Sequence, residues 1–399
     1  MKRTLLCALM LTLLTTAFPQ ATYETFDSFN LNSERKIKIQ LPKNYDAASY
    51  VKHPVILVFD GDYLFEPVAG QVSYQTYWDD MPESIVVGIM HEKTRFYDTY
   101  HDEVTGLPKE FGAEFFQFIG QELLPYIDKK YNTSSFRVVV GHNITANLAN
   151  SFLFKDTPMF SAIVNISPDF TNTMIENTIE RLKTINKDII YYMSTSKKDV
   201  EHIRNSVVYT HDVLNDIDNK HLSYYFDEFE DGKHYAYAPQ AIAKSLDKIF
   251  DLYKPLRTKE LKEKVMTYEG TLDKYLEEKY DNIEKLFGVV KEIPKSDFEK
   301  VARIADKRED GASLQKLGKL ANKRHPDDLL GNYYLAQHYE KIGKDKKAKK
   351  YYESALELND VSHIDREFIL SRVEELGLAE QDDDEEEDEE EVDEEEDDN

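Results

Sequence analysis

The chain has 399 residues, of which 41% are hydrophobic, so it is long enough for two or three domains with a sizeable core. Its single cysteine, Cys7, excludes a disulfide framework and a thiolate metal site. The formal net charge is −26, and 16 of the acidic residues lie between positions 382 and 398. Without them a charge of −10 remains, and a mildly acidic body argues against nucleic-acid binding.

The first residues have the pattern of an export signal. Lys2 and Arg3 precede an apolar run from Leu5 to Leu14, and the small residues Ala17 and Ala21 follow it. The run is too short for a comfortable membrane span, and no other segment is apolar enough for one. We therefore expect residues 1–21 to be removed. The mature chain would then be periplasmic or otherwise extracytoplasmic, without a thiol and without a transmembrane segment.

Residues 22–253 alternate between strand-like and helix-like segments. An antiparallel hairpin is predicted first, and short apolar runs then alternate with helical spacing such as that of residues 111–131. Continuous apolar strands separated by helices are typical of a mostly parallel sheet that is covered on both faces. The fold class predicted is therefore α/β. The expected strands cover residues 22–29, 35–41, 55–59, 85–89, 138–140, 162–166, 189–193 and 222–229.

The segment around Asn143 has the pattern of a segment that holds a catalytic nucleophile. The apolar run 136–140 leads through Gly141 and His142 into the helical stretch 144–150. A sharp turn from a strand into a helix is where an α/β-hydrolase holds its nucleophile, normally within Gly-x-Ser-x-Gly. Here Asn143 takes the serine position and Thr145 the position of the second glycine. Asparagine tolerates the positive φ of such a turn, but its amide nitrogen is a very poor nucleophile.

Neighbouring serines are not expected to replace the missing nucleophile. Ser151 should lie about 12 Å along the helix from the turn, at 1.5 Å per residue. Ser134 and Ser135 precede the strand and should lie at the opposite end of the sheet. Because Thr145 and Ala146 stand where glycines are usual, we expect their side chains to crowd the pocket.

Several motifs in the right order resemble the putative-esterase family of α/β-hydrolases, which includes esterase D and the enterochelin-type siderophore esterases. The resemblance covers the first 250 residues and implies the α/β-hydrolase fold, with His234 as the catalytic histidine. Several members of that family also carry a C-terminal repeat region. The matching segments are Asp60-Gly61-Asp62, Gly88-Ile89 with Arg95 and Asp98, Glu122 to Ile127, Gly141-His142, Ile166-Ser167-Pro168 and Glu230 to His234.

The remaining parts of a serine-hydrolase site can be assigned by position. Asp199 follows the strand 189–193, where the chain order nucleophile, acid, histidine places the acid, and Glu201 is the competing carboxylate. The oxyanion hole would use the backbone N–H of Ile144 and that of Asp62 or Tyr63. No cofactor and no metal is expected.

The C-terminal third is predicted to be helical. Residues 254–297 are interpreted as a connector, and a period of 34 residues follows over residues 298–380. This spacing is typical of tetratricopeptide repeats, which dock partner proteins, and Tyr339 and Tyr352 are the predicted contacts; an unrelated pair of amphipathic helices is the alternative. The repeat positions are Leu335, Ala336, Tyr339, Gly343, Ala348, Tyr352 and Ala355.

Residues 381–399 form an acidic tail whose composition predicts disorder. Such a run can bind a basic partner or divalent cations weakly, or it can serve only solubility. It lacks the ordered ligand spacing of a calcium loop.

Two functional hypotheses follow. The first is an exported pseudo-esterase that has lost acyl-transfer chemistry and acts as a binding or assembly module through its pocket and its repeats. The second is an active carboxylic-ester hydrolase with an unusual nucleophile. Asn143 with Thr145 favours the first hypothesis.

Overall fold

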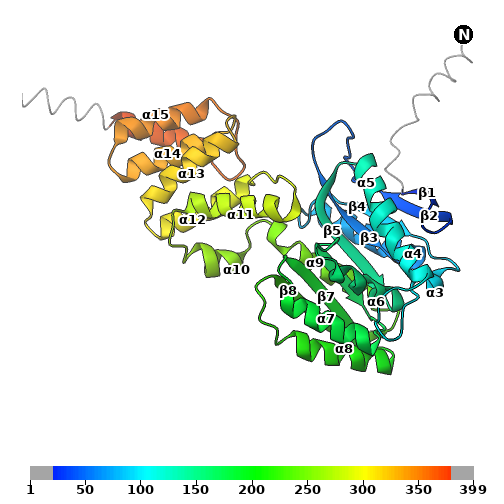
Figure 1. Ribbon diagram of the computed structural model, residues 1–399. Coiled ribbons are helices and arrows are strands. Elements are labelled where there is room, and N and C mark those ends of the chain that lie inside the picture. Colours follow the sequence, from blue (N-terminus) through cyan, green and yellow to red (C-terminus); the bar gives the residue numbers. More distant parts are fainter. Residues whose placement is uncertain (1–20, 379–399) are drawn as a thin grey trace, which may run out of the picture. The chain divides into compact units, whose positions relative to one another are not determined.

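The computed structural model describes residues 21–378, which are the coloured part of Figure 1. The predicted export signal and the acidic tail lie outside these residues, apart from Ala21 at the end of the signal. The described part divides into two compact units. The first contains residues up to Lys254 together with Lys285–Val289, and the second contains Pro255–Glu284 and the residues from Val290 onward.

The first unit is built on one eight-stranded sheet with the order β1-β2-β4-β3-β5-β6-β7-β8. β1 and β2 form the predicted antiparallel hairpin, and β2 is also antiparallel to β4, whereas every later pair is parallel. All the predicted strands are present. They are β1 (Thr22–Ser28), β2 (Ser33–Gln40), β3 (His53–Val58), β4 (Ile85–Ile89), β5 (Thr133–His142), β6 (Ala162–Ile166), β7 (Ile189–Lys198) and β8 (Leu222–Lys233).

Helices cover both faces of this sheet, as the apolar strands require. In β3 every side chain is buried, and Val55 and Leu57 belong to the main core cluster, which also contains side chains of α4, α6, α7 and α8. On the other side, α2 and α9 pack against each other. The helices are α2 (Gly61–Tyr77), α3 (Arg95–Asp98), α4 (Phe111–Gln117), α5 (Leu124–Lys130), α6 (Ile144–Asn150), α7 (Asn172–Thr184), α8 (Glu201–Leu214) and α9 (Ala238–Ile249).

This arrangement is the α/β-hydrolase fold. The predicted helix 111–131 is present, but it contains one π-helical stretch, η1 (Phe118–Leu123), between α4 and α5. A short 3-10 helix, η2 (Ser151–Phe154), continues α6, and another, η3 (Asp251–Tyr253), follows α9.

The second unit is helical. The predicted connector, residues 254–297, is helical; Pro255–Glu284 clusters with the residues from Val290 onward, whereas Lys285–Val289 clusters with the first unit. Buried contacts hold this segment in place: the Leu256 amide donates to Asp297, and the Leu272 amide donates to Ser313. The elements are α10 (Thr258–Glu260), η4 (Leu261–Val265), α11 (Leu272–Phe287), α12 (Lys295–Lys307), α13 (Gly311–Arg324), α14 (Leu330–Lys341) and α15 (Asp345–Leu356).

Helix pairs recur in this unit at the predicted spacing. α13 begins at Gly311 and α15 at Asp345, and these helices pack in order with α14 between them (Figure 1). Ala348, Tyr352 and Ala355 form the buried stripe of α15. The helical region is thus present, and its assignment as tetratricopeptide repeats stays a prediction. Within residues 21–378, no helix is both long enough and apolar enough to cross a membrane.

Candidate active site at the carboxyl edge of the sheet

The candidate site residues gather at one edge of the sheet because each follows the carboxyl end of a strand. Asp60 comes after β3, Asn143 after β5, and Ser167 after β6. Asp199 follows β7 and His234 follows β8. In open α/β sheets, ligands bind outside the carboxyl ends of the strands, so this edge is the expected position of a site.

Asn143 has the backbone conformation of a nucleophile elbow. Its φ is 60° and its ψ is −123°, a combination that costs a residue with a side chain on the order of 1–3 kcal/mol. Gly141 allows the sharp turn, since a Cβ there would lie 2.7 Å from Cα of Ala146. The Asn143 side chain is half-buried. The backbone N–H of Asn143 donates to the carbonyl of Ile166, which ties the elbow to β6.

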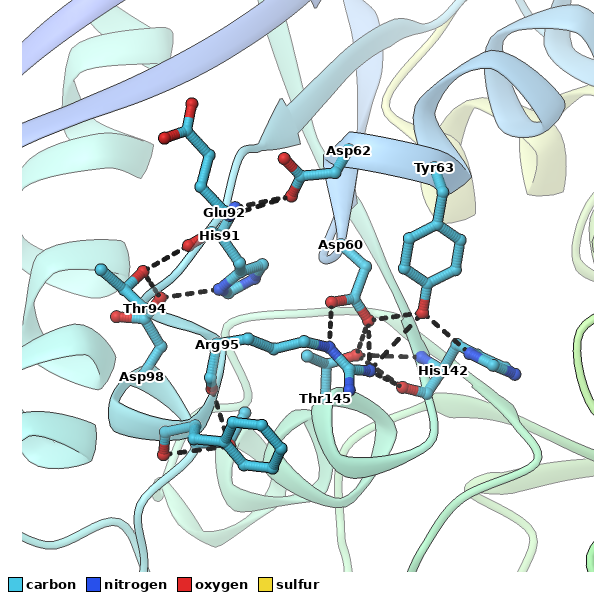
Figure 2. Close-up of polar contacts among 12 residues, drawn as sticks. Asp60, Asp62, Tyr63, His91, Glu92, Thr94, Arg95, Asp98, His142 and Thr145 are labelled. Atoms are coloured by element: carbon cyan, nitrogen blue, oxygen red, sulfur yellow. Dashed lines mark hydrogen bonds and ion pairs between the residues drawn. The ribbon is translucent and has the colours of Figure 1, made fainter.

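A buried polar network lies beneath the elbow (Figure 2). Arg95 donates to both carboxylate oxygens of Asp60, at 2.5 and 2.9 Å, and also to the His142 carbonyl at 3.0 Å. Thr145 Oγ1 lies 2.7 Å from Asp60 Oδ2 and accepts the His142 amide at 3.0 Å. Burial opposes ionisation of Asp60, but the Arg95 guanidinium outweighs it, so the pKa of this carboxyl lies below its usual value.

The expectation that Thr145 crowds the pocket is therefore wrong. Its side chain is completely buried, and its hydroxyl forms hydrogen bonds with the Asp60 carboxylate and with the backbone of His142. Ala146, also buried, packs against Gly141. Threonine in the glycine position is accommodated because a carboxylate lies within reach of its hydroxyl.

Replacing Thr145 with valine is expected to destabilise the fold by about 2 kcal/mol. Valine keeps the shape but leaves the buried His142 amide without its acceptor and Asp60 without one donor. Denaturant unfolding measures the change. Thr133→Val is the matched control, because the Thr133 hydroxyl also bonds a carboxylate, that of Asp128, but at an exposed site. Equal losses in both variants would contradict the role given to the network.

His142 connects the elbow to the histidine loop. Its Nε2 lies 3.3 Å from the carbonyl of His234, and its Nδ1 lies 2.9 Å from the Tyr63 hydroxyl. The ring is fully buried. Burial, together with the neighbouring His234, lowers the pKa of His142 to about 4, so this imidazole is neutral at physiological pH.

The structure brings His234 and Asp199 together. His234 Nδ1 lies 2.7 Å from Asp199 Oδ1, which leaves Nε2 as the ring nitrogen not engaged by the carboxylate. Burial opposes ionisation of Asp199, but hydrogen bonds from His234, Ser167, the Val200 amide and Thr195 outweigh it and lower its pKa to about 2. Asp199 therefore stays ionised and can orient the imidazole. The competing carboxylate, Glu201, is exposed on the first turn of α8.

Ser167 is a site residue that the sequence reasoning named only as part of a motif. Its hydroxyl donates to Asp199 Oδ2 at 2.5 Å and lies 2.8 Å from His234 Nδ1. It is fully buried and adjoins the ring nitrogen that faces the carboxylate, so it is placed to orient the pair. Of the other serines considered, Ser134 and Ser151 are buried, and Ser134 lies against Gly288.

The three candidate oxyanion amides, those of Ile144, Asp62 and Tyr63, differ in availability. Ile144 and Asp62 lie in the first turns of α6 and α2, where backbone amides have no intrahelical acceptor. The Tyr63 amide, however, donates to the Asp60 carbonyl at 3.0 Å. Ile144 with Asp62 is therefore the better pair. The Asp62 carboxylate accepts the His91 amide at 2.8 Å and so points toward the end of β4 (Figure 2).

Exposed aromatic rings border these residues. The Tyr235 ring is 70% exposed, and its centroid lies 4.8 Å from that of His234 and 5.3 Å from that of His142. Tyr63, 40% exposed, meets Tyr235 edge-on at 6.3 Å. Aromatic surface beside convergent polar groups is typical of ligand sites.

The two tyrosines predicted to contact a partner protein differ in burial. Tyr339 is half-buried on α14 and stacks on Tyr351 with a centroid separation of 5.3 Å. Tyr352 is fully buried, and its hydroxyl donates to Glu340. Tyr352 therefore supports the packing of α15, and its prediction as a contact residue is corrected. Among residues 21–378, no group of three or more His, Cys, Asp or Glu side chains could hold a metal ion.

Comparison with known proteins agrees with this fold. Residues 28–237 match the family described as putative esterase. An uncharacterised protein from Capnocytophaga ochracea, known from its crystal structure, is 32% identical, with a TM-score of 0.80 over 90% of this chain and 100% of that one. No curated protein matches the chain.

More distant solved structures share the fold. An IroE-like serine hydrolase from Shewanella oneidensis has a TM-score of 0.59 at 18% identity, over 76% of this chain and 99% of its own. A siderophore hydrolase, EstA from Aspergillus nidulans, has a TM-score of 0.51 at 16% identity, over 60% and 97%. Fold and site together define an esterase-like α/β-hydrolase. The chain belongs to the putative-esterase family.

Proposed function

We propose that this protein is a pseudo-esterase, which binds a ligand at the elbow without hydrolysing it. The observation that carries the proposal is Asn143 in the strained elbow conformation beside a complete His234–Asp199 pair. A carboxamide cannot be converted into an alkoxide equivalent by a neighbouring base, so acyl transfer to this side chain is not available. The strained turn and the ordered polar groups are nevertheless present, and an ordered arrangement of this kind is what a binding site requires.

The proposed ligand site consists of the elbow, the first-turn amides of Ile144 and Asp62, and the exposed rings of Tyr63 and Tyr235. The amides favour an oxygen that carries negative charge, such as a carbonyl or carboxylate oxygen. The rings offer apolar area beside it. We further propose that the protein is exported and that its helical unit contacts a protein partner, with Tyr339 as the remaining candidate contact.

One observation favours a second candidate, an ester hydrolase that uses water as its nucleophile. The ionised carboxylate of Asp199 holds Nδ1 of His234. Nε2 of His234 could then accept a proton from a water molecule while the resulting hydroxide attacks the ester carbonyl. The Ile144 amide would then hold the oxyanion, and the alcohol would leave with the proton from His234.

Hydrolysis of short-chain aryl esters separates the two candidates. We expect the native protein and His234→Ala to give the same rate as buffer between pH 6 and 9, because neither forms an acyl-enzyme. His221→Gln, on a histidine paired with Asp188 outside the site, controls for the substitution itself. Turnover by the native protein that falls on removal of His234 but survives in His221→Gln would establish the water-based hydrolase instead.

A further inference from the structure

Another pocket lies at the edge of the sheet opposite the elbow. This cavity, the α2 pocket, measures about 500 Å³ and is bounded by the end of β2, the last turns of α2 and the segment before β4. Gln40, the last residue of β2, pairs with Val86 near the start of β4, so this is the amino edge of the parallel strands. α2 begins beside the elbow and has 17 residues, which places the pocket about 25 Å away. Its volume is typical of small-molecule sites.

Part of the lining of the α2 pocket is apolar and aromatic. Leu41 and Val72 line it, and so does Tyr77, whose ring is 78% exposed. The neighbouring Trp78, 60% exposed, meets the Tyr77 ring edge-on at a centroid distance of 5.0 Å. The face of an aromatic ring carries partial negative charge and attracts polarised C–H groups. This part of the lining therefore suits a ligand that has apolar C–H faces.

Two pairs of polar side chains also line the α2 pocket. Gln40 Nε2 donates to Ser73 Oγ at 3.2 Å, and Asn44 Nδ2 donates to Glu83 Oε1 at 3.3 Å. These bonds hold the side chains in place. They leave the side-chain carbonyl oxygens of both amides, and Glu83 Oε2, without a hydrogen bond from any residue that the structure describes. The pocket thus offers both donors and acceptors to a ligand.

Thr76 adds a hydroxyl that lacks a partner. This residue lines the α2 pocket, its Oγ1 is buried, and no residue within the described range 21–378 forms a hydrogen bond with that oxygen. A buried hydroxyl without a partner is unfavourable. A threonine in a helix has two favoured χ1 rotamers, so rotation of this side chain can bring its hydroxyl to a ligand in the pocket.

We propose that the α2 pocket binds a short neutral saccharide. A sugar ring has apolar C–H faces and a rim of hydroxyl groups that each donate and accept, which matches the aromatic surface and the polar pairs. The ionisable side chains in the lining, those of Lys43 and Glu83, have opposite charges, which argues against an anion or a cation. A purely aliphatic ligand would bury the amides and the carboxylate without hydrogen bonds, at a cost in free energy.

A saccharide in the α2 pocket leaves the elbow accessible. The two sites share no residue and lie at opposite edges of the sheet, so this inference does not rest on the proposed function. The protein then has two independent ligand sites, one for a sugar and one at the elbow.

Tryptophan fluorescence of the full chain tests the proposal, because Trp78 is the single tryptophan and its ring contacts that of Tyr77. The probes are lactose, maltose, cellobiose and N,N′-diacetylchitobiose, and hexanol represents a neutral aliphatic ligand. We expect at least one disaccharide to change the emission of Trp78 along a saturable curve, with a Kd in the millimolar range. The proposal is overturned if none of the disaccharides changes the emission, or if hexanol alone does so.

Saturation-transfer NMR on the bound disaccharide gives a second readout, which does not involve Trp78. Tyr77→Ala should weaken binding about tenfold, because the stacking surface is lost. Tyr74→Ala is the matched control, since Tyr74 is 62% exposed on the same helix but does not line the pocket. Thr76→Val should also weaken binding without lowering the free energy of unfolding, because the hydroxyl it removes has no partner among the described residues. Unchanged binding in Tyr77→Ala, or an equal loss in Tyr74→Ala, would place the sugar elsewhere and overturn the proposal.

Discussion

Replacing Asn143 with serine is expected to create ester hydrolysis in a protein that we propose has none. Serine would enter a turn that already has the elbow conformation, in a site that already contains the His234–Asp199 pair and first-turn amides. A complete triad is worth up to about 10⁶-fold in kcat, and a serine introduced into a site that lacks one aligns less well with its base than the serine of an evolved triad. We therefore expect a gain of about 10³-fold over the buffer rate, measured with short-chain aryl esters.

Two control variants test whether the gained activity depends on the new hydroxyl and on His234. Asn143→Ala should remain inactive, because it changes the same position without supplying a hydroxyl. Asn143→Ser combined with His234→Ala should lose most of the gained rate, because serine needs the base. An Asn143→Ser protein that unfolds normally but hydrolyses nothing would show that the site has lost more than its nucleophile.

The second large effect is a pH dependence of stability caused by His142. Its pKa is lowered from 6.5 to about 4 in the folded protein, so the unfolded chain binds the proton more readily between these values. The contribution of neutral His142 to the free energy of unfolding is therefore fully present above pH 6.5 and is lost as the pH falls toward 4. The full difference corresponds to roughly 3 kcal/mol.

Denaturant unfolding between pH 4 and 7 measures this dependence. His142→Gln should have a flatter stability profile than the native protein over that range. His202→Gln serves as the matched control, because the side chain of His202 is 71% exposed. Parallel pH profiles for the native protein and His142→Gln would show that this histidine is not held neutral by its surroundings.

The sheet could be predicted from the sequence because its signal is local. Runs such as Val55 to Phe59 are continuously apolar, and a run of that length can be buried only as a strand or as part of a helix. The hairpin follows from alternation in residues 35–41. The π-helical stretch at Phe118–Leu123 has no such signal, since the apolar residues Ile119, Leu123 and Ile127 recur every four residues as in an ordinary α-helix.

The site could be predicted only in part, and for a physical reason. Asn143 and Asp199 could be assigned as candidates because each follows a strand in a known order, and His234 because its segment resembles that of the family's catalytic histidine. The network of Asp60, Arg95 and Thr145 joins residues 35 to 85 positions apart. Pairing over such distances depends on how neighbouring strands align. From the sequence Thr145 could be recognised only as a departure from the usual glycine, because its burial and its contact with Asp60 appear only in the folded chain.

The other differences between the sequence-based predictions and the structure concern which side chains are buried. Tyr352 fits the repeat pattern either as a contact or as a packing residue, and only its complete burial separates the two. The segment 254–297 is highly charged, which suggested a connector. Its buried residues, such as Leu272 and Ile283, are nevertheless spaced at about one per helical turn and pack into the helical unit.

The most direct test of the pseudo-esterase account is labelling with a fluorophosphonate, followed by mass spectrometry of the intact protein. The reagent forms a stable bond only with a serine activated by a neighbouring base. We expect no adduct on the native protein and one adduct, at position 143, on Asn143→Ser. A stoichiometric adduct on any serine of the native protein would contradict the account.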